Sequence, residues 1–292
     1  MHIPDGFLST PVWAAFDVVA APAVGILAKR AQRDIEEHNI PFMGVMGAFI
    51  FAAQMINFPV GPGTSGHLVG GSLLAITLGP SVAAIVMTAI LAVQALVFQD
   101  GGILALGANV FNMAIIGVLA GYIPYRLLRN SAGVFMGGVA SVLASGAFAL
   151  AQLWISGIPL SGKILAITAG FFAVGALLEG AITLAAIRAL ERMNPAWIRN
   201  TKKPAGRTLV LVGVAALVLA VAGILIASTH PDGIEVLAAS HAPVWMHAPL
   251  ADYQAHGIES PWLRKSAAGI AGLVVIYVAC FAAGRWIRQR SA

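Results

Sequence analysis

Residues 67–78, His-Leu-Val-Gly-Gly-Ser-Leu-Leu-Ala-Ile-Thr-Leu, decide how the rest of the chain is threaded. The run is apolar after its first residue, but about 12 residues rise only about 18 Å as a helix, short of a hydrocarbon core of about 30 Å. If this segment crosses a membrane, each later loop lies on one side. If it does not cross, each later loop lies on the other side, so the charges of those loops must settle its path.

The whole chain has the composition of a polytopic helical membrane protein. Of its 292 residues, 59% are hydrophobic and 10% are charged, against about 25% charged residues in ordinary soluble domains. Apolar runs close to or above about 18 residues recur along it, as in helices that span a bilayer. Nine apolar segments stand out: about 11–28, 41–57, 67–78, 81–98, 103–122, 133–155, 164–188, 208–227 and 266–284.

The basic residues favour nine crossings. With the N-terminus outside, only Lys163, Arg264 and Lys265 of the 17 Lys and Arg then lie outside. If residues 67–78 did not cross, most of the basic residues would lie outside, against the positive-inside rule. The net charge of +5 therefore indicates membrane orientation and not nucleic-acid binding. We expect a multi-pass protein of a bacterial plasma (inner) membrane, with its N-terminus external and its C-terminus cytoplasmic.

The chain changes character after the seventh apolar segment. Residues 189–207 are basic and interrupted by prolines, which is typical of a cytoplasmic linker. We expect an all-α polytopic membrane protein in two domains. Residues 1–200 form a seven-helix transmembrane bundle, and residues 201–292 form a two-helix hairpin with an external segment, 228–265.

The amino terminus offers an unusual set of metal ligands. The Met1 amine, the His2 amide nitrogen and the His2 imidazole can close adjacent chelate rings around one ion, and the His67 imidazole would complete four nitrogens. Nitrogen-rich tetragonal sites suit Ni²⁺, Cu²⁺ and, less well, Co²⁺. The nine-segment topology places Met1, His2 and His67 on the same side of the membrane. We expect no cleaved signal peptide, because no basic segment precedes the first apolar run, and Met1 should be retained.

Two glycine-rich stretches imitate nucleotide-binding loops. Gly61–Gly66 fits the spacing of a dinucleotide-binding turn, but it follows an apolar helix and not a strand. Gly157–Ile164 nearly matches a phosphate-binding loop, but Ile164 replaces the Ser or Thr that the loop requires. The sequence therefore predicts a protein that is not an enzyme and has no ATPase of its own.

Several motifs together resemble the substrate-capture component of energy-coupling factor cobalt/nickel uptake transporters, the CbiM/NikM family. They are Met1–Leu8 (Met-His-Ile-Pro-Asp-Gly-Phe-Leu), Phe51–Val60, Gly63–Leu68 (Gly-Thr-Ser-Gly-His-Leu) and Gly107–Ala114. The resemblance covers residues 1 to about 200. Residues 228–256 are similar to the accessory N component, whose Pro-Asp-Gly-Leu-Glu signature appears here as Pro231–Glu235 with Ile for Leu.

The resemblance implies a function and partners. It implies that Ni²⁺ or Co²⁺, as transported ligand and not as cofactor, sits on the Met1 amine, the His2 amide nitrogen and imidazole, and the His67 imidazole. It implies a membrane coupling (T) component and cytoplasmic ATPase subunits as partners, with lipid around the chain. The donors are the same for nickel and cobalt, so the sequence does not separate the two metals.

Other polar residues are candidates for orienting the ligands, although helix capping or hydrogen bonding between helices would explain each equally well. They are Asp5, Asn57, Thr64, Ser65, Asn109 and Asn112. Asp17 and Glu179 lie inside apolar spans, where ionisable residues are a functional hypothesis by default. His230, His241, His247 and His256 have irregular spacing and indicate a second metal site only weakly.

Two other functions fit part of the pattern. A proton-coupled secondary transporter would use Asp17 or Glu179 as a proton carrier, but no inverted repeat is visible in the segment pattern. A membrane-embedded metalloenzyme would need an open ligand position and a nearby base. A filled four-nitrogen set disfavours that alternative.

Overall fold

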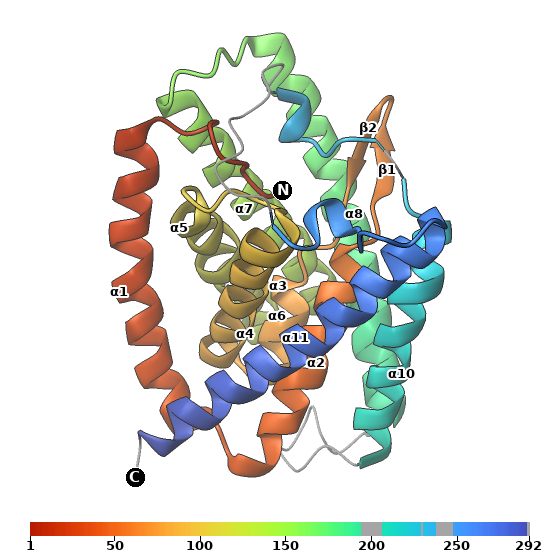
Figure 1. Ribbon diagram of the computed structural model, residues 1–292. Helices are drawn as coiled ribbons and strands as arrows, with labels where there is room; N and C mark the ends of the chain where they lie inside the picture. The colour runs from red at the N-terminus through yellow and green to blue at the C-terminus, as the bar shows by residue number, and fades with distance from the viewer. Residues whose placement is uncertain (194–205, 229, 238–247, 291–292) are drawn as a thin grey trace.

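The computed structural model describes residues 1–193, 206–228, 230–237 and 248–290, which form a helical bundle with one short β-hairpin (Figure 1). The α-helices are α1 (Thr10–Asp34), α2 (Ile40–Gln54), α3 (Gly71–Leu78), α4 (Pro80–Val93), α5 (Leu106–Asn109), α6 (Val118–Leu128), α7 (Ser131–Ile155), α8 (Gly162–Met193), α10 (Gly206–Ala222) and α11 (Pro261–Gln289). The hairpin pairs β1 (Phe58–Gly61) with β2 (Thr64–Gly66) in antiparallel register.

Short helical turns complete the secondary structure. Two π-helical turns continue α4 and join α5 to α6, namely η2 (Gln94–Phe98) and η3 (Val110–Gly117). The 3-10 turns are η1 (Glu37–Asn39), η4 (Gly223–Leu225), η5 (Glu235–Leu237) and η6 (Ala251–Tyr253). π-Turns are rare and often lie at functional sites, and the first of these leads directly into the loop that carries Asp100.

Each of the nine apolar segments contains a helix, so the prediction of an all-α polytopic membrane fold is confirmed. Within the described residues, seven helices are long and apolar enough to cross a membrane. The helices of the other two apolar segments are α2 and α3, with 15 and 8 residues, or about 22 and 12 Å. Both are largely buried by other helices, so protein and not lipid surrounds the backbone at their ends.

The third segment differs from its predicted extent. We expected residues 67–78 to be helical, but the helix begins at Gly71. Gly70 has a φ of +77°, a left-handed conformation that glycine adopts without steric cost and that ends the extended chain of residues 67–69. His67 therefore lies in the loop before α3 and not on the helix itself.

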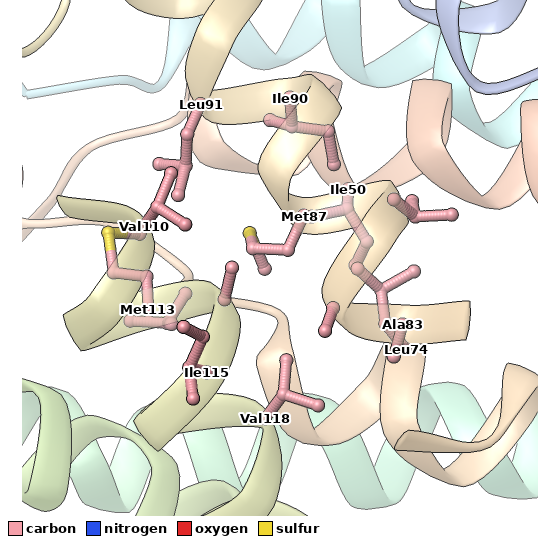
Figure 2. Close-up of a cluster of buried hydrophobic side chains, with 14 of the residues drawn as sticks. Ile50, Leu74, Ala83, Met87, Ile90, Leu91, Val110, Met113, Ile115 and Val118 are labelled. Atoms are coloured by element: carbon pink, nitrogen blue, oxygen red, sulfur yellow. The ribbon is translucent and has the colours of Figure 1, made fainter. Parts of the chain in front are cut away.

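The core lies between the short helices and their neighbours. Side chains from α2, α3, α4, η3 and α6 meet there, among them Ile50, Leu74, Met87, Met113 and Val118 (Figure 2). Helix α11 crosses the front of the bundle diagonally and packs on α2 and α4, while α10 packs on α2 and α11 (Figure 1). Helix α1 lies at the edge of the bundle, and its apolar surface is mostly exposed to the surroundings.

Four loops gather on one side of the bundle. The chain before α1 turns back to the middle of the molecule (Figure 1), where Met1 and His2 contact His67, Asp100 and Asp232. His67 precedes α3 and Asp100 follows α4, so the two helices together return the chain to its starting side. This agrees with a path in which α3 completes a crossing. Which side is external stays a prediction of the charge argument.

Candidate metal centre

The amino terminus is held in a buried polar site. The Met1 amine nitrogen lies 2.7 Å from His67 Nε2 and pairs with the Asp232 carboxylate. The rings of His2 and His67 are stacked, with centroids 5.0 Å apart and planes 8° apart. His2 and the side chains of His67 and Asp232 are almost fully buried. The structure thus brings together the three residues that the sequence singled out, and it adds a carboxylate that the sequence did not.

The hydrogen bonds of His67 define its tautomer. Its Nδ1 lies 2.9 Å from the carbonyl oxygen of Leu68, so Nδ1 carries the hydrogen and donates it. Nε2 is then the nitrogen with a free lone pair, and it faces the Met1 amine. This is the state in which an imidazole accepts a metal ion.

His2 is held from the opposite side. Its Nδ1 lies 3.0 Å from Asp100 Oδ1, while its Nε2 is buried without a hydrogen-bond partner. In the chelate that the sequence predicts, Nδ1 is the ring nitrogen that can bind the same ion as the His2 amide nitrogen, so Asp100 holds the atom that a metal would use. An unpartnered buried nitrogen costs free energy.

A chain of hydrogen-bonded side chains runs from His2 to the loop that carries His67. The Tyr253 hydroxyl donates to Asp100, and Gln94 Nε2 lies 3.3 Å from the Tyr253 oxygen. Gln94 Nε2 also donates to Gln54 Oε1 at 3.0 Å, and Gln54 Nε2 donates to the Val69 carbonyl at 2.9 Å. The chain therefore runs from His2 to the backbone two residues after His67. Sequence analysis missed these residues, although polar side chains inside the apolar runs of α2 and η2 were a usable signal.

Hydrogen bonds and close contacts to its backbone hold the amino-terminal segment before α1 in place. Asn109 accepts a hydrogen bond from the Ile3 amide at 2.8 Å and donates to the Ile3 carbonyl at 3.0 Å. Asp5 accepts from the amides of residues 103–105. Gly101 has a φ of +88°, and a Cβ there would lie 3.2 Å from the His2 Cβ. These contacts fix His2 without touching its imidazole.

Glu179 anchors the loop that carries His67. Its two carboxylate oxygens accept from the amides of Val69 and Gly70, each at 2.8 Å, at the N-terminus of α3. Asp17 accepts from the Gly107 amide at 2.8 Å, at the N-terminus of α5. Both side chains thus accept hydrogen bonds from backbone N–H groups at helix starts.

The remaining predicted positions take varied places. Ser65 donates to the carbonyl of His230 at 2.6 Å and joins the C-terminal segment to β2 through a bridge with Asp232. Thr64 is buried in β2, and Asn57 lines the cavity beside the site. Asn112 exchanges hydrogen bonds with Gln152 of α7 at 2.7 and 2.8 Å. His230 lines the same cavity and His256 is exposed, while His241 and His247 lie outside the described residues.

Burial and charge set the protonation of the site. Burial, followed by the charges of the Met1 amine and His2, lowers the pKa of His67 from 6.5 to about 3. Burial alone would raise the pKa of Asp232, but the adjacent amine outweighs burial and lowers it. Burial likewise opposes the effect of His2 on Asp100, whose pKa is lowered. His67 is therefore neutral and both carboxylates are ionised near pH 7.

A cavity of about 510 Å³ opens beside the site. His2, His67, Asp100, Asp232, Glu235 and Tyr253 are among the residues that line it. Among the described residues, no group of three or more His, Cys, Asp or Glu is arranged to hold a metal ion.

A helical bundle with seven helices that could cross a membrane, within the described residues, and a buried polar site on one side define the class of a multi-pass membrane protein. The comparisons with known proteins identify the family. The pattern of the CbiM family, described as the cobalt uptake substrate-specific transmembrane region, matches residues 2–197. The chain belongs to this family of transition-metal transport proteins.

Individual relatives agree. The chain is 34% identical, over 99% of both lengths, to a putative fused nickel transport protein NikMN of Archaeoglobus fulgidus. It is 43% identical to a putative metal transport protein of Haloquadratum walsbyi, over 63% of this chain and 86% of the relative. A crystal structure of a truncated transition metal transporter aligns with a TM-score of 0.56 at 36% identity, over 66% of this chain and 99% of that one.

Proposed function

We propose that this chain is the substrate-capture membrane component of an energy-coupling factor importer for Ni²⁺ or Co²⁺. One observation carries the proposal. The Met1 amine nitrogen lies 2.7 Å from His67 Nε2, and the His2 ring stacks on the His67 ring. Three nitrogen donors from the first two residues and one loop lie within reach of a single ion. The Met1 amine, His2 and His67 are the proposed ligands.

The donor set favours soft-to-borderline divalent metals over Mg²⁺ and Ca²⁺, which prefer oxygen ligands. The fourth nitrogen would be the His2 amide, which joins the amine in a chelate ring. Ni²⁺ gains most from a planar four-nitrogen field, so nickel is the preferred substrate of the two. Binding must displace the ammonium proton that now pairs with Asp232, so metal capture releases protons.

Metal affinity of the purified chain tests this assignment. His2→Ala, His67→Ala and a chain with one residue added before Met1 should each weaken Ni²⁺ binding more than about a hundredfold, beyond the range of changes around a ligand. His38→Ala is the control, because His38 lies before α2 and pairs with Glu36. Unchanged affinity in the three site variants would remove the metal assignment. A wild-type chain that binds neither metal would do the same.

The partners proposed for the chain are a membrane coupling component and cytoplasmic ATPase subunits. The near-match to a phosphate-binding loop at Gly157–Ile164 forms the turn between α7 and α8 and carries no Ser or Thr at its last position. We further propose that residues 201–292 correspond to the accessory component joined to a capture domain of residues 1–200. The full-length similarity to a relative described as a fused nickel transport protein supports this division.

Uptake into proteoliposomes tests the energy source. The chain alone should not accumulate ⁶³Ni²⁺ inside vesicles under a pH gradient, whereas co-reconstitution with its coupling and ATPase subunits and ATP should produce uptake. Uptake by the chain alone, driven by the pH gradient, would instead support a proton-coupled secondary transporter. Walker-motif variants of the ATPase subunits provide the control for ATP dependence.

A further inference from the structure

The cavity beside the site joins solvent to the proposed ligands. Its lining includes His230, Glu235 and Asp252, which are exposed, and also the almost fully buried side chains of His2 and His67. The buried part of this wall carries an unpaired polar atom, because His2 Nε2 has no hydrogen-bond partner among the described residues. A single cavity whose wall runs from exposed to buried residues is a path by which a solute can reach the site.

The size of the cavity fits an ion that still carries its water. About six water molecules surround a divalent ion in solution, and at about 30 Å³ each they occupy about 180 Å³. The cavity has a volume of about 510 Å³, so it has room for the ion together with this shell. The waters can therefore be exchanged for nitrogen ligands inside the protein and not before entry.

The charge of the cavity wall favours a cation. Carboxylates outnumber Lys and Arg side chains in its lining, with Asp100, Asp232, Glu235 and Asp252 against Lys265. The first two carboxylates are paired with His2 and with the Met1 amine. Glu235 and Asp252 form no ion pair with a basic side chain in the part of the chain that the structure describes. A cleft lined by one sign of charge raises the local concentration of the opposite ion.

The position of the Glu235 carboxylate is fixed by a capping box. It accepts from the Asp232 amide at 2.9 Å, while Asp232 Oδ1 accepts from the amides of Ile234 and Glu235 at 2.7 and 2.9 Å. This reciprocal pattern begins the turn η5. Gln serves in place of Glu in a capping box, so Glu235→Gln removes the charge and keeps the turn.

We propose that this cavity is the entry route of the hydrated metal ion, and that Glu235 and Asp252 steer the ion into it against the opposing charge of Lys265. This inference rests on the proposed function. The ion is first attracted with its waters, by charge, and then exchanges the waters for nitrogens. The association rate is proportional to the population of the first encounter, whereas the dissociation rate depends on the bonds to nitrogen. The steering charges therefore change association and leave dissociation unaltered.

Stopped-flow mixing of the full chain with Ni²⁺ tests the proposal, in nanodiscs of neutral lipid at pH 8, far above the ordinary carboxyl pKa. Glu235→Gln and Asp252→Asn should each slow association about threefold at about 0.1 M salt. Asn tolerates the left-handed φ of 54° at Asp252. Lys265→Gln should speed association by a similar factor. Glu259→Gln is the matched control, because Glu259 is an exposed carboxylate of the same segment that does not line the cavity.

Salt, dissociation and melting separate steering from other causes. At about 1 M salt the screening length falls to about 3 Å, so the rates of all variants should converge. Dissociation into excess EDTA and the melting temperature should match the wild type. Unchanged association in Glu235→Gln, slower association in Lys265→Gln, or an effect confined to dissociation would each overturn the inference. If the wild type binds Ni²⁺ and His67→Ala does not, the proposed function stands whatever these rates are.

Discussion

At the scale of single residues, the chemistry of the site depends on which ring nitrogens already have hydrogen-bond partners. His67 donates Nδ1–H to a carbonyl and keeps Nε2 for the amine, while His2 gives Nδ1 to Asp100 and leaves Nε2 buried without a partner. Each imidazole is therefore held in a defined orientation by one of its ring nitrogens. Both are oriented before any ion arrives, which reduces the ordering that binding must supply.

Asn109 and Asn112 form a matched pair for testing this pre-organisation. Both are buried asparagines with two side-chain hydrogen bonds, but Asn109 clamps Ile3 and Asn112 joins η3 to α7. Substituting either by Ala should destabilise the protein by about 1–3 kcal/mol, because buried partners lose their hydrogen bonds. Only Asn109→Ala should also weaken Ni²⁺ binding, by about tenfold. Thermal melting and calorimetric titration measure the two effects, and equal affinity losses would contradict the distinction.

The lowered pKa of His67 predicts how stability responds to acid. In the unfolded chain a histidine titrates near 6.5, whereas burial and the neighbouring amine and His2 charges lower the folded pKa to about 3. As pH falls from about 6.5 towards 3, the unfolded state gains a proton that the folded state refuses, so stability is lost in that window. The melting temperature of the metal-free protein should therefore fall more steeply between pH 7 and 4.5 than that of His67→Gln. Parallel profiles would show that His67 does not titrate differently on unfolding.

At the scale of secondary-structure elements, backbone amides at helix N-termini fix the loops of the site. The N-terminus of α3 receives Glu179, and that of α5 receives Asp17, with Asp5 on the loop before it. Ionisable residues in apolar helices first suggest proton transfer. Here each accepts backbone hydrogen bonds at the start of a helix, and Glu179 thereby fixes residues 69–70 against α8.

Substitution of Glu179 separates anchoring from proton carriage. In Glu179→Gln one side-chain oxygen remains, so one of the two amides of the His67 loop loses its acceptor and stability should fall by about 1–3 kcal/mol. Ni²⁺ affinity should fall with it, because the loop that presents His67 is no longer fixed. Full affinity combined with a loss of transport in the assembled importer would instead favour a proton-carrying role. Melting, titration and uptake on the same preparation decide between the two.

The elements also show what sequence reasoning could and could not reach. That Met1, His2 and His67 lie together was predictable, because donor chemistry, charge asymmetry and the family resemblance all pointed to one side of one membrane. The extended start of segment 67–78 was not, since it depends on Glu179, more than a hundred residues away. In the sequence, Asp232 and Tyr253 stood out only as part of the stretch similar to the accessory N component, and Asp100 was not singled out. Their role depends on how the C-terminal segment packs over η2 and β2, which no local pattern specifies.

At the scale of the whole molecule, the metal site joins two parts of the chain. Residues before about 200 supply the proposed ligands, and residues after 206 supply Asp232 and Tyr253. Helices α10 and α11 bury one face of α2, and Gly272 of α11 lies so close to Phe51 that an added Cβ would meet its ring at 2.3 Å. The C-terminal region is thus seated by helix packing as well as by its polar contacts. Small residues allow such close approach of helices in lipid.

This arrangement predicts the behaviour of a chain cut in two. Residues 1–199 and 200–292, expressed together as separate polypeptides, should assemble in the membrane because the contacts of α10 and α11 with α2 and α4 do not require a covalent link. An affinity tag on the second piece should retrieve the first, with Ni²⁺ affinity close to that of the intact chain. Gly272→Leu in the second piece should abolish retrieval, since a large side chain cannot fit against Phe51, whereas Gly213→Leu, at a glycine with open space around it, should not. Retrieval of the first piece by the Gly272→Leu piece would mean that the polar loops, and not the helices, hold the two parts together.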